Sequence, residues 1–213
     1  MASSACGFFL QRVGLASSVT FGNVYIAQVT LGNRLQLEEE NQMKFTSDDT
    51  ALRLDKCMEF ACVFELVKEI VRRDLGLSRA GLMLGLAELP ERVGAFHGVG
   101  GNFIVMNRKL LDVVVRSAEN RRQINAYVFY ILLHEYLHAL GFLSEKQVEE
   151  TSAELCEKAL GIDHPATQMA KHGIKMVLKD VTPLQHLSDE EIGRPPGLEI
   201  ISDFDREITK WYV

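Results

Sequence analysis

Apolar residues fill positions 126–133 without interruption, and this stretch dominates the hydrophobic pattern of the chain. Together with the residues on either side, it predicts a helix over 120–140, which Gly141 ends. The sequence S-E-K-Q at 144–147 resembles a capping box and predicts a second helix that runs to Leu160. The pattern therefore indicates two consecutive helices joined by a short turn.

The rest of the chain predicts a mixture of strands and helices. Residues 81–89 have the pattern of a buried strand that Pro90 ends, and residues 102–107 that of a second short strand. The glycine-rich segment 93–101 between them predicts a flexible turn or loop, because it lacks the spacing of phosphate-binding glycine motifs. Helices are predicted at three further places: one core helix from Ser47 to Leu75, one over 108–117, and one from Pro165 to about Leu178.

These elements predict an α+β fold in which a small mixed sheet packs on a helical bundle that carries the apolar helix. The length of 213 residues fits one domain with extensions. We assign residues 47–180 to this domain. Residues 1–46 are assigned to an N-terminal extension, with short strands expected at 24–29 and 34–37.

Residues 181–213 are assigned to a C-terminal extension, in which 198–201 has the pattern of a strand. Acidic residues are concentrated after Ser188, and we interpret them as a solvated tail. They are Asp189, Glu190, Glu191, Glu199, Asp203, Asp205 and Glu207.

Composition narrows the class of protein. Apolar residues make up 47% and charged residues 24% of the chain, as in ordinary soluble globular proteins. The net charge is −6 and no run of Lys or Arg occurs, so we expect no nucleic-acid partner. No uncharged apolar run reaches the roughly 18 residues of a membrane span, and no signal peptide is expected. None of the four cysteines forms C-x-x-C, so we expect no disulfide framework and a reducing, cytoplasmic compartment.

The apolar helix carries an H-E-x-x-H motif, H-E-Y-L-H at 134–138. Residues four apart lie on one face of a helix, so His134 and His138 can hold one Zn²⁺ between them at about 2.0–2.1 Å from each ring. Glu135 lies beside them, where it can act as a general base on a metal-bound water. Burying two imidazoles and a carboxylate in an apolar helix is costly unless they are paired or bound to a metal. The motif therefore predicts zinc-assisted hydrolysis, most often of a peptide bond.

A catalytic zinc site needs a third protein ligand and an open position. If the second helix folds back antiparallel to the first, residues 148–152 face the two histidines. Two carboxylates fall there, and the sequence leaves the choice open. Glu149 lies nearer to the apolar stripe of its helix, whereas Glu150 has a second carboxylate, Glu154, at the i+4 position. We predict Glu150 as the third ligand, with Glu149 or another group as the alternative.

The motif H-E-Y-L-H, followed by E-T-S-A-E at 150–154, resembles the gluzincin branch of the HExxH zincin metallopeptidases, which includes thermolysin-like enzymes and minigluzincins. In that branch a downstream helix carries E-x-x-x-D, and its first Glu is the third ligand. The resemblance implies this role for Glu150 and a supporting role for Glu154, which stands in place of the usual Asp. The segment 94–107 is similar to the strand–loop–strand that precedes the active-site helix in zincins, where an edge strand binds the peptide by strand addition. A metzincin is a weaker match, because Ser144 stands where that clan has His or Asp.

Function follows as an expectation from the motif and the resemblance. We expect a soluble zinc metallopeptidase that acts on a peptide or protein substrate, with Zn²⁺ as its cofactor. The alternative is a zincin-like binding or regulatory protein whose metal site is structural or vestigial. A structural site would be closed by four protein ligands, whereas a catalytic site keeps one position open.

Other candidate residues receive less specific interpretations. His97, next to the glycine-rich segment, is interpreted as a surface histidine, with donation to an oxyanion as the alternative. His164 is expected to start a helix rather than bind a metal. For Tyr127, Tyr130 and Tyr136 the expected role is packing.

Overall fold

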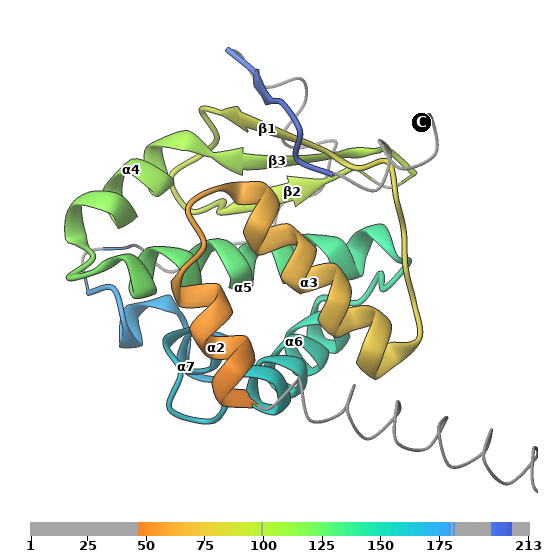
Figure 1. The fold of residues 1–213 in the computed structure, drawn as a ribbon. Helices are drawn as coiled ribbons and strands as arrows, with labels where there is room; N and C mark the ends of the chain where they lie inside the picture. Colours follow the sequence, from red (N-terminus) through yellow and green to blue (C-terminus); the bar gives the residue numbers. More distant parts are fainter. Residues whose placement is uncertain (1–46, 99, 180, 182–196, 206–213) are drawn as a thin grey trace, which may run out of the picture. The chain divides into compact units, whose positions relative to one another are not determined.

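Residues 47–98, 100–179, 181 and 197–205 are described by a computed structural model (Figure 1). By its internal contacts the chain divides into two units, Met1–Lys44 and Phe45–Val213, and all the described residues belong to the second. The strands expected at 24–29 and 34–37 lie outside the described residues.

The sheet has four strands in the order β2-β3-β1-β4 within the described part of the chain. Strands β1 (Met83–Ala87) and β3 (Phe103–Asn107) are parallel, with Gly85 opposite Val105. Strand β2 (Ala95–His97) is antiparallel to β3, and β4 (Glu199–Ile201) is antiparallel to β1. The prediction of an α+β fold with a small mixed sheet is confirmed. The interpretation of 93–101 as a loop is wrong for β2, although the strand–loop–strand implied by the resemblance is present.

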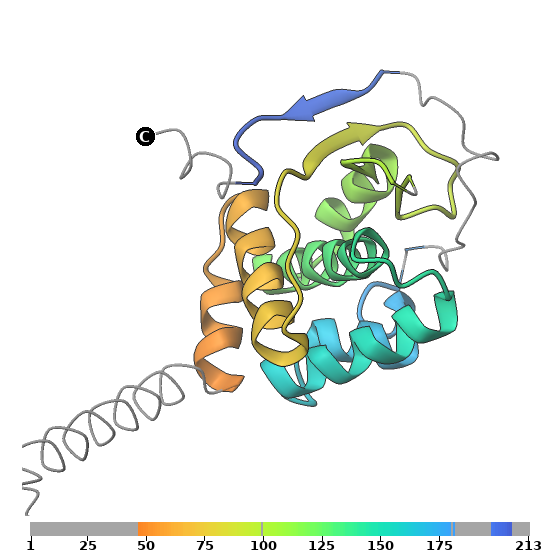
Figure 2. The ribbon, with the colours of Figure 1, turned by 90° about the vertical axis from the view of Figure 1, so that its right-hand side faces the viewer.

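The described helices gather around one central helix, α5 (Arg121–Ala139), which carries the H-E-x-x-H motif. It contacts the other five α-helices as well as β2 and β3, and Figures 1 and 2 show it beneath the sheet. The other helices are α2 (Ser47–Asp55), α3 (Phe60–Leu75), α4 (Arg108–Ser117), α6 (Glu145–Leu160), α7 (Pro165–His172) and the short 3₁₀ helix η1 (Ile174–Met176). The last predicted helix is shorter than expected because Gly173, at φ +85°, ends α7. No helix among the described residues is both long enough and apolar enough to cross a membrane.

The single core helix predicted from Ser47 to Leu75 is wrong, because the chain breaks between α2 and α3. The amide of Asn125, on α5, donates hydrogen bonds to the carbonyls of Leu54 and Cys57 at 2.8 and 2.9 Å. These bonds hold the backbone at and just after the end of α2. The break brings Cys57 and Cys62 together in a disulfide. The expectation of no disulfide is therefore wrong, and it no longer supports a reducing compartment.

The C-terminal extension contributes to this fold. The strand predicted at 198–201 is confirmed as β4, and the side chain of Leu198 lies over Gly85 of β1. A Cβ at Gly85 would lie 2.4 Å from Cδ1 of Leu198. The interpretation of the acidic residues as a solvated tail is wrong for Asp205, which is 8% exposed and pairs with Lys68.

Candidate metal centre

The motif helix is fixed at both ends by its own sequence. At its start, the side chain of Asn120 accepts a hydrogen bond from the backbone N–H of Gln123 at 3.1 Å. At its end, Gly141 adopts the left-handed conformation at φ +100°. The N–H groups of Gly141 and Phe142 then donate to the carbonyls of His138 and Leu137 at 2.9 and 3.1 Å, which is a Schellman motif. This turn reverses the chain directly after the second histidine.

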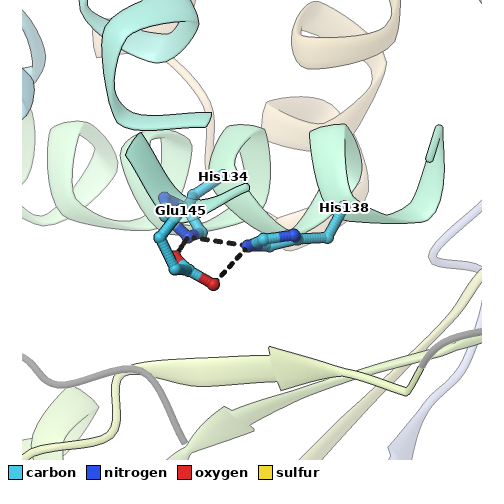
Figure 3. A group of neighbouring side chains, drawn as sticks. All are labelled: His134, His138 and Glu145. Atoms are coloured by element: carbon cyan, nitrogen blue, oxygen red, sulfur yellow. Dashed lines mark hydrogen bonds and ion pairs between the residues drawn. The ribbon is translucent and has the colours of Figure 1, made fainter. Parts of the chain in front are cut away.

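Three donor groups converge at this turn: His134 and His138 from α5, and Glu145 from the first turn of α6 (Figure 3). The Nε2 atoms of the two rings are 3.2 Å apart, and the carboxylate oxygens of Glu145 lie 3.2 Å from His134 Nε2 and 3.1 Å from His138 Nε2. Tetrahedral zinc with bonds of about 2.0–2.1 Å places its donors about 3.3–3.4 Å apart. Two different oxygens of Glu145 make the two contacts, and the three side chains lie close enough to share one metal ion.

The hydrogen bond on the far side of the His138 ring supports a cation site. Its Nδ1 lies 2.8 Å from the carbonyl oxygen of Phe142, which can only accept, so Nδ1 carries the proton. In the neutral ring, Nε2 then has a lone pair that faces the carboxylate oxygens of Glu145. Electron pairs brought together in this way repel one another unless a cation or extra protons lie between them. A backbone carbonyl that fixes the ring of a metal-binding histidine is also a common feature of metal sites.

Solvent reaches the donor group from the side of the carboxylate. His134 is 2% exposed, His138 14% and the side chain of Glu145 46%. The site is thus anchored in the core by the two rings and completed by a group at the surface. Within the described part of the chain, these three residues form the one group of at least three His, Cys, Asp or Glu side chains close enough to share a metal.

The predicted third ligand, Glu150, is not among these donors. It lies at the surface, with its carboxylate 3.7 Å from Nζ of Lys146. Glu149 and Glu154 are also exposed. The prediction assumed that α6 runs antiparallel beside α5, but Figures 1 and 2 together show that α6 crosses α5 steeply. As a result the first turn of α6, and not its second, meets the histidines.

Glu135 lies in α5 between His134 and His138 in the sequence and is 3% exposed. The ring of Tyr130, one turn earlier, packs edge-on against the ring of His134, with the ring centroids 6.4 Å apart. Burial raises the pKa of Tyr130, and the charges of Glu149, Glu135 and Glu145 raise it further. The phenol therefore stays protonated at neutral pH.

No family model matches the chain, and no curated protein or solved structure matches it. The resemblance to the gluzincin branch therefore depends on the H-E-Y-L-H motif and on the strand–loop–strand that precedes it. Of the carboxylates that this resemblance implied downstream, neither Glu150 nor Glu154 belongs to the donor group.

The other candidate residues from the sequence are two histidines, His97 and His164, and the buried tyrosines of the motif helix. His97 is 8% exposed, with Nδ1 2.9 Å from the carbonyl oxygen of Phe103, so its interpretation as a surface histidine is wrong. His164 starts α7 as predicted, since its Nδ1 accepts a hydrogen bond from the N–H of Ala166 at 3.2 Å. Tyr127 and Tyr136 are fully buried, which confirms their packing role.

Proposed function

We propose that the protein is a zinc-dependent hydrolase, and more specifically a zincin-like metallopeptidase. His134, His138 and Glu145 would hold the ion. The proposal depends on one observation: three side chains of metal-binding type converge, and the group is exposed to solvent on the side of the Glu145 carboxylate. An ion held there would keep a fourth position for water. Hydrolysis needs this open position for water and substrate.

The bound ion would polarise a carbonyl oxygen and lower the pKa of a water molecule in the open position. The residues of the chain then supply the proton transfers. Glu135 takes the proton from the attacking water and later delivers it to the leaving amine. Glu135 is adjacent to His134 in the motif and is buried, at 3% exposed, as a general base in a water-excluding site would be.

The edge strand β2 supports a peptide as the substrate. In the sheet order β2-β3-β1-β4 it pairs with β3 alone among the described strands, and it contacts α5. An extended peptide can add to such an edge through main-chain hydrogen bonds. A peptide bound there would run alongside the helix that carries the donors.

A structural or vestigial metal site is the alternative, and the exposure of Glu145 argues against it. Structural zinc sites are closed by four protein ligands, whereas this group has three and its carboxylate is 46% exposed. X-ray absorption on the zinc-loaded protein separates the two functions. We expect two imidazole nitrogens, one carboxylate and one water. A spectrum with four protein donors would favour the structural alternative.

The decisive variant is Glu135→Gln, with Glu149→Gln as the control at an exposed position. We expect Glu135→Gln to bind zinc with wild-type stoichiometry while kcat on a peptide library falls by at least about 10²–10⁴-fold. Glu149→Gln should keep both properties. Chelator-sensitive hydrolysis at the wild-type rate in Glu135→Gln would exclude the role assigned to this residue.

A further inference from the structure

Residues 197–205 pair with β1 through strand β4 and then reach α3, where Asp205 contacts Lys68. Figure 2 shows this segment beside the sheet. We propose that this segment, the C-terminal clasp, positions the end of α5 that carries the donors, with Asp205 as the positioning residue. The inference rests on the proposed metal site and adds a part of the chain that lies far from it in sequence. Three connections carry the argument.

The first connection is a buried ion pair. The side chains of Asp205 and Lys68 are each 1% exposed, and Nζ of Lys68 lies 2.7 Å from Oδ1 of Asp205. Glu65 also contacts Nζ at 2.8 Å, but its side chain is 36% exposed. Desolvation alone would lower the pKa of Lys68, but the hydrogen bonds and charges of Asp205 and Glu65 raise it above its ordinary value. The lysine is therefore charged in the core, and Asp205 is its buried counter-ion.

The second connection runs through the segment 79–82. Oδ2 of Asp205 accepts hydrogen bonds from the N–H groups of Gly81 and Leu82 at 3.0 and 3.3 Å. Two residues earlier, the backbone N–H of Arg79 donates to the hydroxyl of Tyr136 at 2.8 Å, and that hydroxyl donates to the Arg79 carbonyl at 3.1 Å. One short segment is thus held by Asp205 at one end and by the motif helix at the other.

The guanidinium of Arg79 strengthens this link at the helix end. It donates to the carbonyl of Ala139 at 2.6 Å, one residue after the ligand His138, and also to the carbonyl of Gly101. A cation at the C-terminus of a helix stabilises the last turn through the helix dipole and through its free carbonyls. Here that turn is the one that orients His138.

The third connection is a chain of aromatic rings. Phe204 stacks on Phe64 with centroids 4.2 Å apart and an interplanar angle of 18°. Phe64 in turn meets Tyr136 edge-on, with centroids 5.3 Å apart. Tyr136 lies between the two ligand histidines in the motif. All three rings are buried, so movement of Phe204 changes the packing under the donors.

The second and third connections end on the same turn of α5, and the first fixes Asp205 on α3, so loss of the clasp should loosen that turn and spread the donors. Metal binding depends on the close approach of the two Nε2 atoms and the carboxylate of Glu145, which are joined by contacts of 3.1–3.2 Å, so it is more sensitive to this loosening than the fold as a whole. Removal of the C-terminal residues is therefore expected to weaken the metal site. If the C-terminal residues were instead an inhibitory tail over the site, their removal would make the site more accessible.

The test compares Asp205→Asn with Asp203→Asn in the full-length protein. Asp203 is exposed and has φ +56°, a conformation that Asn tolerates, so it offers the same substitution without the buried contacts. Zinc affinity is measured by competition with a chromogenic chelator, well below the unfolding temperature. We expect at least a tenfold loss for Asp205→Asn and no change for Asp203→Asn. Amide exchange at Leu140 and Gly141, whose N–H groups close the last turn, should accelerate only in Asp205→Asn.

The proposed role of the C-terminal clasp would be overturned if Asp205→Asn kept the zinc affinity and the amide exchange rates of the wild-type protein. If this variant does not fold, Phe204→Leu takes its place, because it keeps the ion pair and an apolar side chain while it removes the stack. A several-fold loss of affinity is then expected, and an unchanged affinity would again overturn the clasp. If the wild-type protein itself binds no zinc, the metal proposal fails. The clasp is then judged by the exchange rates alone.

Discussion

Replacement of Glu145 by Gln separates the donor group seen in the structure from the third ligand that the sequence favoured. The matched control is Glu150→Gln, the same substitution five residues later in the same helix. Glu145 contacts both ligand rings at 3.1–3.2 Å, whereas Glu150 contacts the exposed Lys146 at 3.7 Å. We therefore expect zinc binding to depend on Glu145 and to be independent of Glu150.

The expected size of the effect follows from linkage. Zinc at about 1,000 times its dissociation constant stabilises the folded state by about 4 kcal/mol, which raises the Tm of a chain of this size by about 8–16 °C. Loss of one of three ligands should weaken affinity at least as much as loss of an outer partner does, by about 100-fold. At the same zinc concentration, the stabilisation then falls to about 1.4 kcal/mol, or about 3–6 °C.

The assay is thermal unfolding of each variant with zinc and with a chelator. The wild-type protein and Glu150→Gln should show the full zinc-dependent rise in Tm, and Glu145→Gln about a third of it. The reverse result, with the rise lost in Glu150→Gln and kept in Glu145→Gln, would refute the assignment of the third ligand.

Two further predictions concern the stability of the domain. Replacing Cys57 and Cys62 together by Ser removes a cross-link that closes a very short loop, which should lower the free energy of unfolding by about 2 kcal/mol in urea titrations; an oxidised wild-type protein no more stable than the variant would contradict this. Burial would raise the pKa of Asp74, but its hydrogen bonds to Arg73 and Lys158 lower it below 3.8. The stabilisation by Asp74 is therefore present above pH 3.8 and is lost as the pH falls through the lower pKa of the folded state. Asp74→Asn should lower the free energy of unfolding by about 1–2 kcal/mol at pH 7, and this loss relative to wild type should shrink in acid. A loss that is constant with pH would exclude the ion pairs as its cause.

Elements whose ends are determined by neighbouring residues could be predicted from the sequence. Asn120 and Ser144 cap the starts of α5 and α6 through N–H groups three residues away, and Gly141 and Gly161 end the same helices. The pair of metal-binding histidines belongs to this class, because four residues of one helix determine their spacing. Strand β4 was also predictable from its pattern, although its partner strand was not.

Features that depend on residues distant in sequence could not be predicted. The break between α2 and α3 is stabilised by Asn125, which lies 68 residues after Cys57. Asp205 is buried because Lys68, 137 residues earlier, needs a counter-ion. The third ligand belongs to the same class, because the crossing of α5 and α6 is set by what they pack against, including α2, α3 and α7. The crossing angle of α5 and α6 therefore cannot be predicted from the sequence of these two helices alone.

The His138 ring is held by a carbonyl of the main chain, and this has a consequence for mutagenesis. No side-chain replacement at Phe142 can delete that oxygen, so an alanine scan would leave the contact intact and report nothing about it. A mutation can move this oxygen by changing the backbone conformation at Gly141. Gly141 has φ +100° with open space around its missing Cβ, so a β-branched residue there would meet no steric clash yet would strain the turn and rotate the acceptor away. A position without any functional group of its own would thus control the hydrogen bond that orients the His138 ring.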